Sequence, residues 1–415
     1  MDFSIIRKNG GLVKPYEQTP SETLDLSVID RLPVLRCNTR TLHVFRHGPE
    51  AAEVIREALS KALVPYYPLA GRLEESNNGQ LQICCGGEGV WFVEASANCT
   101  LDSVNYFDNV ESIPYLQLLP DYVPQDEHNE PLVQMQVTQF ECGGFVIGLL
   151  FSHTICDGLG AAQFLTAVGE LARNRNITQL TISPVWSRNF SPNFTTTPPP
   201  IPPPPMPNYK LQHATIDIST DHITQIKQQF NKSTSQNCST FEVIAATFWK
   251  HRTISINLTH DTEIKLVFFA NCRRVLDTPL PKGFYGNCFF PVTITVSSER
   301  LTRASDIEVI KLIREAKGKV GEEFNEYLKV GESEPFGPAV GYTSLFMSEW
   351  GRLGFNEVDY GWGKPVHVIP IQGSGIMPVG IVGSLPLGNK GVRLMTWCVE
   401  ELHRPQFLLR MMKLN

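Results

Sequence analysis

A histidine and a carboxylate stand four residues apart in the stretch HTICDG, at His153 and Asp157. They follow an unbroken apolar run, residues 145–151, that has the length and pattern of a buried strand. From residue 161 onward, apolar side chains recur at helical spacing. The pair therefore lies in a turn between a buried strand and a helix. Because a polar pair at such a place is costly to desolvate unless it is paired or used, we expect it to take part in chemistry.

The HxxxD pattern alone is weak, and the chain contains it twice. The second pair, His213 and Asp217, lies in an alternating stretch typical of a strand. At roughly 3.3 Å per residue, side chains four residues apart on a strand lie about 13 Å from each other. We therefore interpret the second pair as structural and the first, which lies in a glycine-containing turn, as the candidate site.

Other catalytic patterns are missing or incomplete. No serine lies in a GxSxG elbow, no phosphate-binding loop is present, and no cluster has the spacing of a zinc site. Residues 158–163, GLGAAQ, begin like a dinucleotide-binding motif but lack its third glycine. Cys156 is best interpreted as a packed thiol beside an apolar strand. These observations favour His153 as a general base that activates an external nucleophile, with further rate gained by positioning two substrates together.

A second unusual stretch, DYGWG, occupies residues 359–363. Glycines on both sides of Trp362 allow a tight turn that brings the indole close to another group. A tryptophan packed in the core is the alternative interpretation, and the local sequence does not decide between the two.

Composition sets limits on the rest of the protein. The 415 residues suggest two domains, and 42% hydrophobic residues can bury a large core. A net charge of −6 with no basic run argues against nucleic-acid binding. The longest apolar run is too short to span a bilayer, and we find no signal-peptide pattern. Ten cysteines without a CxxC pair indicate reduced thiols, so we expect a cytoplasmic protein. We also expect a monomer with no membrane partner.

The order of elements indicates an α/β protein with much antiparallel sheet. Residues 49–63 predict an amphipathic helix, and residues 131–140 and 145–151 predict a hairpin that turns at 143–144. A proline-rich stretch at 191–207 predicts an extended linker. We therefore expect an N-terminal domain at 1–190, a crossover linker at 191–212 and a C-terminal domain, with DYGWG, at 213–415.

The second half alternates strands and helices in the same way. A helix should follow Ser239 and Thr240, with Glu242 in its first turn, and another should cover 306–327. Strands are expected at 211–218, 264–271, 289–296, 342–347, 366–370, 379–382 and 392–399.

Together these stretches resemble a family. HTICDG and DYGWG are similar to the two signature motifs of the plant BAHD acyl-CoA-dependent acyltransferases, HxxxDG and DFGWG, in the same order. Further similar segments are YYPLAGRL (66–73), CGGF (142–145), STFEV (239–243), ANCR (270–273) and GFYGNCFFPV (283–292). The resemblance covers nearly the whole chain, and Tyr360 is its one departure in DYGWG.

The resemblance implies two similar chloramphenicol-acetyltransferase-like domains with mixed β-sheets and an active-site tunnel at their interface. His153 would deprotonate an acceptor hydroxyl, which then attacks the thioester of acyl-CoA without an acyl-enzyme. By analogy, the indole N–H of Trp362 would donate to the oxyanion. Acyl-CoA would be a co-substrate and CoA a product, with no permanent cofactor and no metal.

The resemblance also assigns supporting residues. Asp157 would turn away from the substrate and pair with an arginine, here Arg273. Ser239 and Thr240 would contact CoA. The residues that would shape the site are Gly158, Asp359, Gly361 and Gly363.

For substrates, the second half is most similar to hydroxycinnamoyl-CoA:monolignol transferases, which implies feruloyl or p-coumaroyl transfer to an alcohol. Benzoyl or acetyl transfer to an alcohol, and N-acylation of an amine, use the same base and stay open. A CoA-binding protein with a decayed site is the non-enzyme alternative.

Overall fold

The computed structural model describes residues 3–121, 130–174, 177, 179–190, 206–330, 341–371 and 377–414. The chain forms two compact units. The first contains residues 1–199, 280–288 and 352–372, and the second contains residues 200–279, 289–351 and 373–415. Both are α/β units built on a mixed sheet, as the sequence predicted. Among the described residues, no helix combines the length and the apolar character needed to cross a membrane.

The division of the chain corrects the predicted domain boundaries. Two segments that we expected in a C-terminal domain at 213–415, residues 280–288 and 352–372, belong to the first unit. DYGWG lies in the second of these segments. Contacts distant in sequence fix both placements: Val185 bridges to Phe284, and residues 367–370 pair with residues 41–44. The predicted linker at 191–212 lies mostly outside the described residues.

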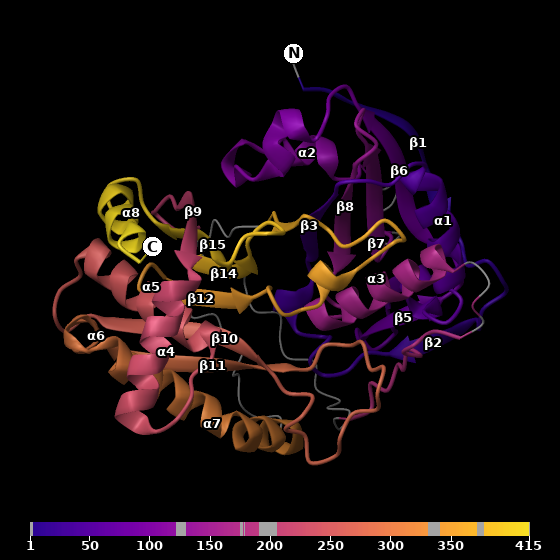
Figure 1. The fold of residues 1–415 in the computed structure, drawn as a ribbon. Helices are drawn as coiled ribbons and strands as arrows, with labels where there is room; N and C mark the ends of the chain where they lie inside the picture. The colour runs from indigo at the N-terminus through magenta and orange to yellow at the C-terminus, as the bar shows by residue number, and fades with distance from the viewer. Residues whose placement is uncertain are drawn as a thin grey trace. The chain divides into compact units, whose positions relative to one another are not determined.

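The first unit is built on the strand order β1-β6-β7-β8-β3-β13 (Figure 1). Only β6 and β7 run parallel. A second, three-stranded sheet has the order β2-β5-β4. The strands are β1 (Ile5–Val13), β2 (Glu22–Asp25), β3 (Asn38–Phe45), β4 (Arg72–Glu75), β5 (Leu81–Cys85), β6 (Val90–Ala97), β7 (Val133–Gln139), β8 (Phe145–Ser152) and β13 (His367–Pro370).

The predicted hairpin is confirmed as β7 and β8, and its apolar run gives one of the most deeply buried strands. The predicted helix at 49–63 is α1 (Ala51–Ala62). It packs against α3 (Gly158–Arg173) and β7, and Figure 1 shows the two helices together beside the sheet. A short helix, α2 (Tyr115–Leu118), contacts β8.

The second unit has the strand order β11-β10-β12-β14-β15-β9, in which β12 runs parallel to both neighbours. Its strands are β9 (Gln212–Ser219), β10 (Glu263–Asn271), β11 (Phe289–Ser297), β12 (Ser344–Glu349), β14 (Val379–Ser384) and β15 (Gly391–Val399). Its helices are α4 (Thr220–Thr234), α5 (Thr240–Ile256), α6 (Ser298–Arg303), α7 (Asp306–Val330) and α8 (Arg404–Met412). The sequence reading did not predict α8.

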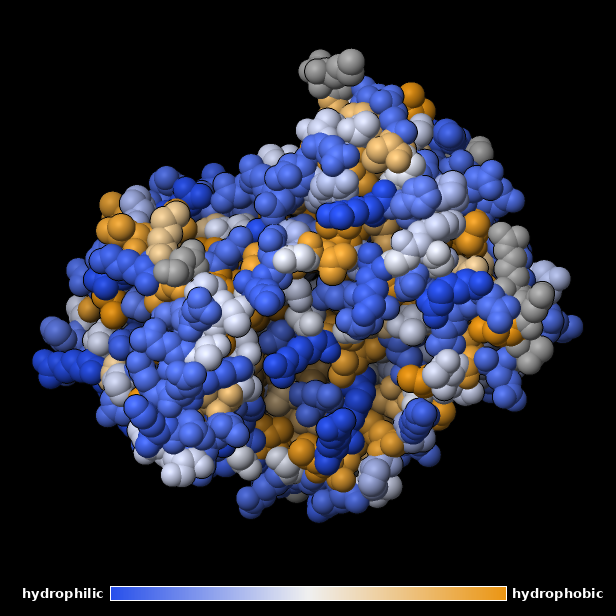
Figure 2. Space-filling view, viewed as in Figure 1, coloured by the Kyte–Doolittle hydropathy of each residue, from blue (hydrophilic) through white to orange (hydrophobic). Residues whose placement is uncertain are grey.

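Helix α5 is the centre of the helical layer of this unit. Its residues are mostly buried, because α4, α6, α7 and α8 all pack on it. Helix α4 is amphipathic instead, and buries Ile223, Ile226 and Phe230. The surface over α4 is correspondingly hydrophilic (Figure 2).

His43 on β3 gives the first unit a dependence on pH. Its ring is buried between the hydroxyl of Thr41 (2.9 Å) and the ring of Phe355. Burial disfavours the imidazolium and lowers the pKa of His43 to about 3. The folded protein therefore keeps a neutral ring while the unfolded chain takes up a proton below its ordinary pKa of 6.5. Stability from this group is present above pH 6.5 and is lost as the pH falls toward 3.

We expect His43→Gln to reduce the drop in melting temperature between pH 7.5 and pH 5. Exposed His260, replaced in the same way, is the matched control and should leave the drop unchanged. Thermal unfolding in buffers of equal ionic strength measures both. An identical pH dependence in His43→Gln and the unmodified protein would contradict this assignment.

Candidate active site

His153 follows β8 directly and is half-buried. Its backbone N–H donates to the carbonyl of Cys37 (2.9 Å), the residue just before neighbouring β3. Its own carbonyl accepts from the side chain of Asn287 (2.8 Å). The main chain on both sides of the imidazole is therefore fixed, while the residue as a whole stays partly exposed. This combination suits a group that must meet a substrate in a defined orientation.

Asp157 is the N-cap of α3. One carboxylate oxygen accepts from Gly160 N–H (3.1 Å), and the other accepts from Cys288 N–H (3.3 Å). The first bond satisfies a donor at the start of the helix, and the second ties the turn to a residue far along the chain. Arg273 lies just after β10 in the second unit, where its N–H donates to Asn271. The predicted pairing of Asp157 with Arg273 stays a prediction.

Two glycines at the start of α3 let other segments approach it closely. A Cβ on Gly158 would lie 2.5 Å from the side chain of Leu353. A Cβ on Gly160 would lie 1.9 Å from the carbonyl oxygen of Tyr285. A larger residue at either position would push away a segment that packs against the histidine turn.

DYGWG forms a turn closed by its own carboxylate. Asp359 accepts from the N–H groups of Gly361 (2.8 Å) and Gly363 (2.9 Å). Both glycines have positive φ, +112° and +94°, a region that residues with a Cβ avoid. The ring of Tyr360 packs on Phe45 and that of Trp362 on Phe145, with centroids 5.5 and 5.8 Å apart.

The structure does not bring Trp362 and His153 together. Phe145 begins β8 and His153 follows its end, about 26 Å away at roughly 3.3 Å per residue of extended chain. Helix α3 gives a second measure: its Gly158 adjoins the histidine turn, while Gly169, about 16 Å further along at 1.5 Å per residue, packs on the carbonyl of Asp359. Trp362 therefore lies at the opposite end of β8 and α3. It cannot donate to an oxyanion at His153, which corrects the role assigned by analogy.

Ser239 and Thr240 begin α5 in the second unit. Ser239 and Glu242 form a capping box, and the hydroxyl of Thr240 accepts from Lys227 (2.8 Å). Burial acts to raise the pKa of Glu242, but hydrogen bonds from Lys317 and Ser239 N–H outweigh it and leave that pKa below its ordinary value. Both hydroxyls thus have partners within the protein, and their contact with CoA stays a proposal.

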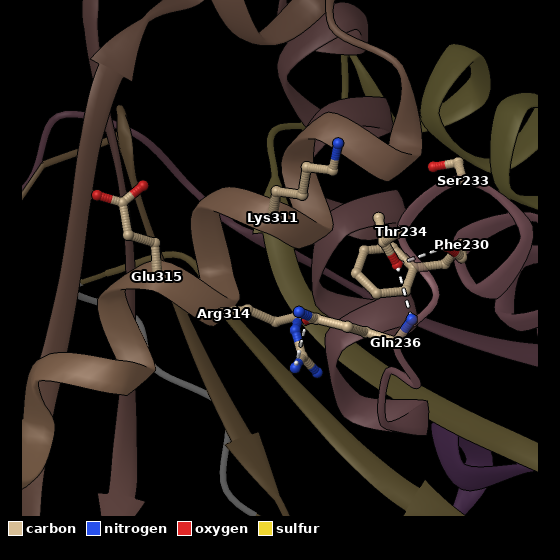
Figure 3. A pocket seen from close by; sticks show the side chains of 7 residues that line it. All are labelled: Phe230, Ser233, Thr234, Gln236, Lys311, Arg314 and Glu315. Carbon is tan, nitrogen blue, oxygen red and sulfur yellow. Dashed lines mark hydrogen bonds between the residues drawn. The ribbon is translucent and has the colours of Figure 1, made fainter.

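A hollow of about 460 Å³ opens in the second unit beside this helix start. Figure 3 shows residues of α4 on one side and residues of α7 on the other. The residues that line it are Phe230, Ser233, Thr234, Gln236, Lys311, Arg314 and Glu315. These residues provide hydroxyl groups and charges of both signs that could bind a ligand. None of them is a residue that the sequence assigned to catalysis.

The second HxxxD pair is structural, as predicted. Asp217 forms a two-point contact with Arg393, at 2.7 and 2.8 Å, across the pair β9–β15. His213 stacks on Trp397 with ring centroids 4.4 Å apart.

Sequence reasoning assigned no role to Asp30, Arg188 or Asn287, which meet beneath the histidine turn. Asn287 lies in the quoted segment GFYGNCFFPV, which was the only available signal. Asp30 and Arg188 lie in segments without any recognisable pattern.

A family model described as "Transferase family" matches residues 3–396. The chain belongs to this family, the BAHD acyltransferases. "Acyl transferase 4" of Oryza sativa subsp. japonica is 42% identical, and the match covers 98% of each chain. "Myricetin 3-O-glucosyl 1,2-rhamnoside 6'-O-caffeoyltransferase AT2" of Crocosmia x crocosmiiflora is 37% identical over 98% of each. "3'-N-debenzoyl-2'-deoxytaxol N-benzoyltransferase" of Taxus canadensis is 34% identical, over 99% of this chain and 96% of the relative.

The fold of this BAHD protein agrees with that of solved relatives. The crystal structure of vinorine synthase superposes with a TM-score of 0.76 at 23% identity, covering 99% of this chain and 98% of the other. Family and relatives together establish the protein as an acyltransferase.

We expect Trp362→Phe to keep kcat within about threefold, because phenylalanine preserves a ring against Phe145. Loss of an oxyanion donor would instead cost about 10² to 10³ in kcat. Steady-state turnover with any accepted donor measures the difference. Trp350→Phe in the second unit controls for a tryptophan substitution, and a hundredfold loss confined to Trp362→Phe would overturn the assignment.

Asp157→Ala should lower the free energy of unfolding by more than the loss of one N-cap, about 1 kcal/mol. The excess comes from Cys288 N–H, which loses its acceptor as well. Ser219→Ala is the control, because it removes the N-cap hydrogen bond of α4 without a contact like that of Cys288. Its loss of unfolding free energy measures the contribution of an N-cap alone. Chemical denaturation of both variants tests this, and equal losses would show that the Cys288 contact contributes nothing.

Proposed function

We propose that the protein transfers a hydroxycinnamoyl group, feruloyl or p-coumaroyl, from CoA to the hydroxyl of an alcohol such as a monolignol. The observation that carries the chemistry is the half-buried residue His153, held by its main chain at the end of a buried strand. A caffeoyltransferase among the relatives supports a hydroxycinnamoyl donor.

In the proposed reaction the neutral imidazole of His153 removes the proton of the acceptor hydroxyl. The oxygen forms a bond to the thioester carbonyl carbon, and the carbonyl electron pair moves to its oxygen. When that carbonyl reforms, the carbon–sulfur bond breaks. The CoA thiolate leaves and takes the proton from the imidazolium, which restores the base. The products are the ester and free CoA, and the enzyme carries no covalent intermediate.

Asp157 supports this chemistry without entering it. Both of its carboxylate oxygens accept backbone N–H groups, one from Gly160 in the first turn of α3 and one from Cys288 in a distant segment. This places the carboxylate in the frame that holds the turn. Ser239 and Thr240 contribute to CoA binding in this proposal, and the ion pair between Asp157 and Arg273 adds to the frame.

His153→Ala should lower turnover by about 10² to 10⁴, the usual contribution of a general base. His213→Ala is the matched control, because it removes the histidine of the second HxxxD pair. Mass spectrometry of the ester product avoids interference from the protein's own thiols, of which ten are free. Undiminished ester formation by His153→Ala would refute the proposed mechanism.

A matrix of donors and acceptors tests the substrates. Feruloyl-, p-coumaroyl-, benzoyl- and acetyl-CoA are each combined with monolignols and with amines. The N-benzoyltransferase among the relatives makes amide formation the second candidate. We expect the highest kcat/KM for a hydroxycinnamoyl donor and an alcohol, and preference for benzoyl-CoA or for an amine would favour the alternative instead.

A further inference from the structure

A buried carboxylate lies beneath the histidine turn. Asp30 is fully buried, and its two oxygens accept from four donors. Oδ1 accepts from the backbone and side-chain N–H groups of Asn287, at 3.2 and 2.7 Å. Oδ2 accepts from the N–H and hydroxyl of Ser27, at 3.0 and 2.7 Å. These four hydrogen bonds compensate the carboxylate of Asp30 for the water that it loses on burial.

Arg188 provides the opposite charge. Its side chain is almost wholly buried, and its Nε lies 3.1 Å from Oδ2 of Asp30. Nη2 donates to the carbonyl of Ile155 (2.6 Å), two residues after His153. The guanidinium also lies over the rings of Trp186 and Tyr285, at 4.2 and 5.3 Å. The cation is therefore held from several sides, and one of its donors holds the histidine turn.

Asn287 links the carboxylate to the histidine itself. It is fully buried, and its side-chain amide donates both to Asp30 and to the carbonyl of His153 (2.8 Å). The neighbouring Gly286 leaves the space that this arrangement needs, since a Cβ there would lie 1.2 Å from Nη1 of Arg188. Asp30 and Arg188 thus act on two carbonyls of the turn, those of residues 153 and 155.

A buried ion pair is a poor source of stability, because desolvation offsets most of the attraction. The hydrogen bonds of this network point to a different role, because its donors bind the carbonyls of His153 and Ile155. We propose that Asp30, Arg188 and Asn287 are positioning residues that fix the main chain of His153 and so orient its imidazole toward the reacting hydroxyl. This inference rests on the proposed role of His153 as the base.

Asn287→Ala removes the donor to His153 and leaves the ion pair in place. Because small displacements of a reacting group are costly, we expect kcat per folded enzyme to fall by about tenfold or more, with KM for acyl-CoA changed less than twofold. Asn325→Ala is the matched control, since Asn325 on α7 also donates through its side-chain amide to two backbone carbonyls, those of Val275 and Gly321. It should leave both parameters unchanged.

The ring of His153 gives a readout that a merely structural role would not move. In protein with ¹³C-labelled histidine, the signal that is lost in His153→Ala belongs to this ring. We expect that signal to shift or broaden in Asn287→Ala and to keep its position in Asn325→Ala. If Asn287→Ala does not fold, Arg188→Lys replaces it, because lysine keeps the charge but cannot contact Asp30 and Ile155 together.

An unchanged kcat together with an unchanged His153 signal, in a folded variant, would overturn the network's role. The proposed function fails separately. If His153→Ala keeps full turnover, the base is misassigned whatever Asn287→Ala does. If His153→Ala is inactive while the network variants match the unmodified enzyme, only the positioning role is lost.

Discussion

The structure around the candidate base depends on hydrogen bonds between one short turn and a segment more than 130 residues later in the chain. Asn287 donates to the carbonyl of His153, and Cys288 N–H donates to Asp157. These two contacts secure the two ends of the turn, one beside the imidazole and one at the start of α3. Neither partner belongs to the sheet that carries the histidine, so the sheet alone does not define the geometry of the site.

Close approach of backbones makes these bonds possible. At Gly160 the start of α3 packs on the carbonyl of Tyr285, and at Gly286 the late segment packs on Arg188. A Cβ at either glycine would meet those atoms at less than 2 Å. Gly160 and Gly286 are therefore needed because a side chain would not fit, whereas the glycines of DYGWG are needed because their backbone has positive φ.

The two signature motifs lie at opposite ends of β8 and α3 in the first unit. The histidine turn lies where β8 ends and α3 begins. DYGWG packs at the other ends of the same two elements, where Trp362 contacts Phe145 and Arg173 donates to the carbonyl of Asp359. DYGWG can thus set how α3 lies along the sheet, while the candidate base lies about a strand length away.

The sequence alone determined features that arise from local periodicity and local hydrogen bonds. The hairpin of β7 and β8, the helix α1, the start of α5 at Ser239 and Thr240 and the turn that carries His153 all follow from residues close together in the chain. Only the tertiary structure placed residues 280–288 and 352–372 in the first unit, separated Trp362 from His153, and brought Asp30, Arg188 and Asn287 together. Asn287 and Asp30 are 257 residues apart, and paired Pro370 and Thr41 are 329 apart (370 − 41). No spacing within one sequence encodes contacts over such separations.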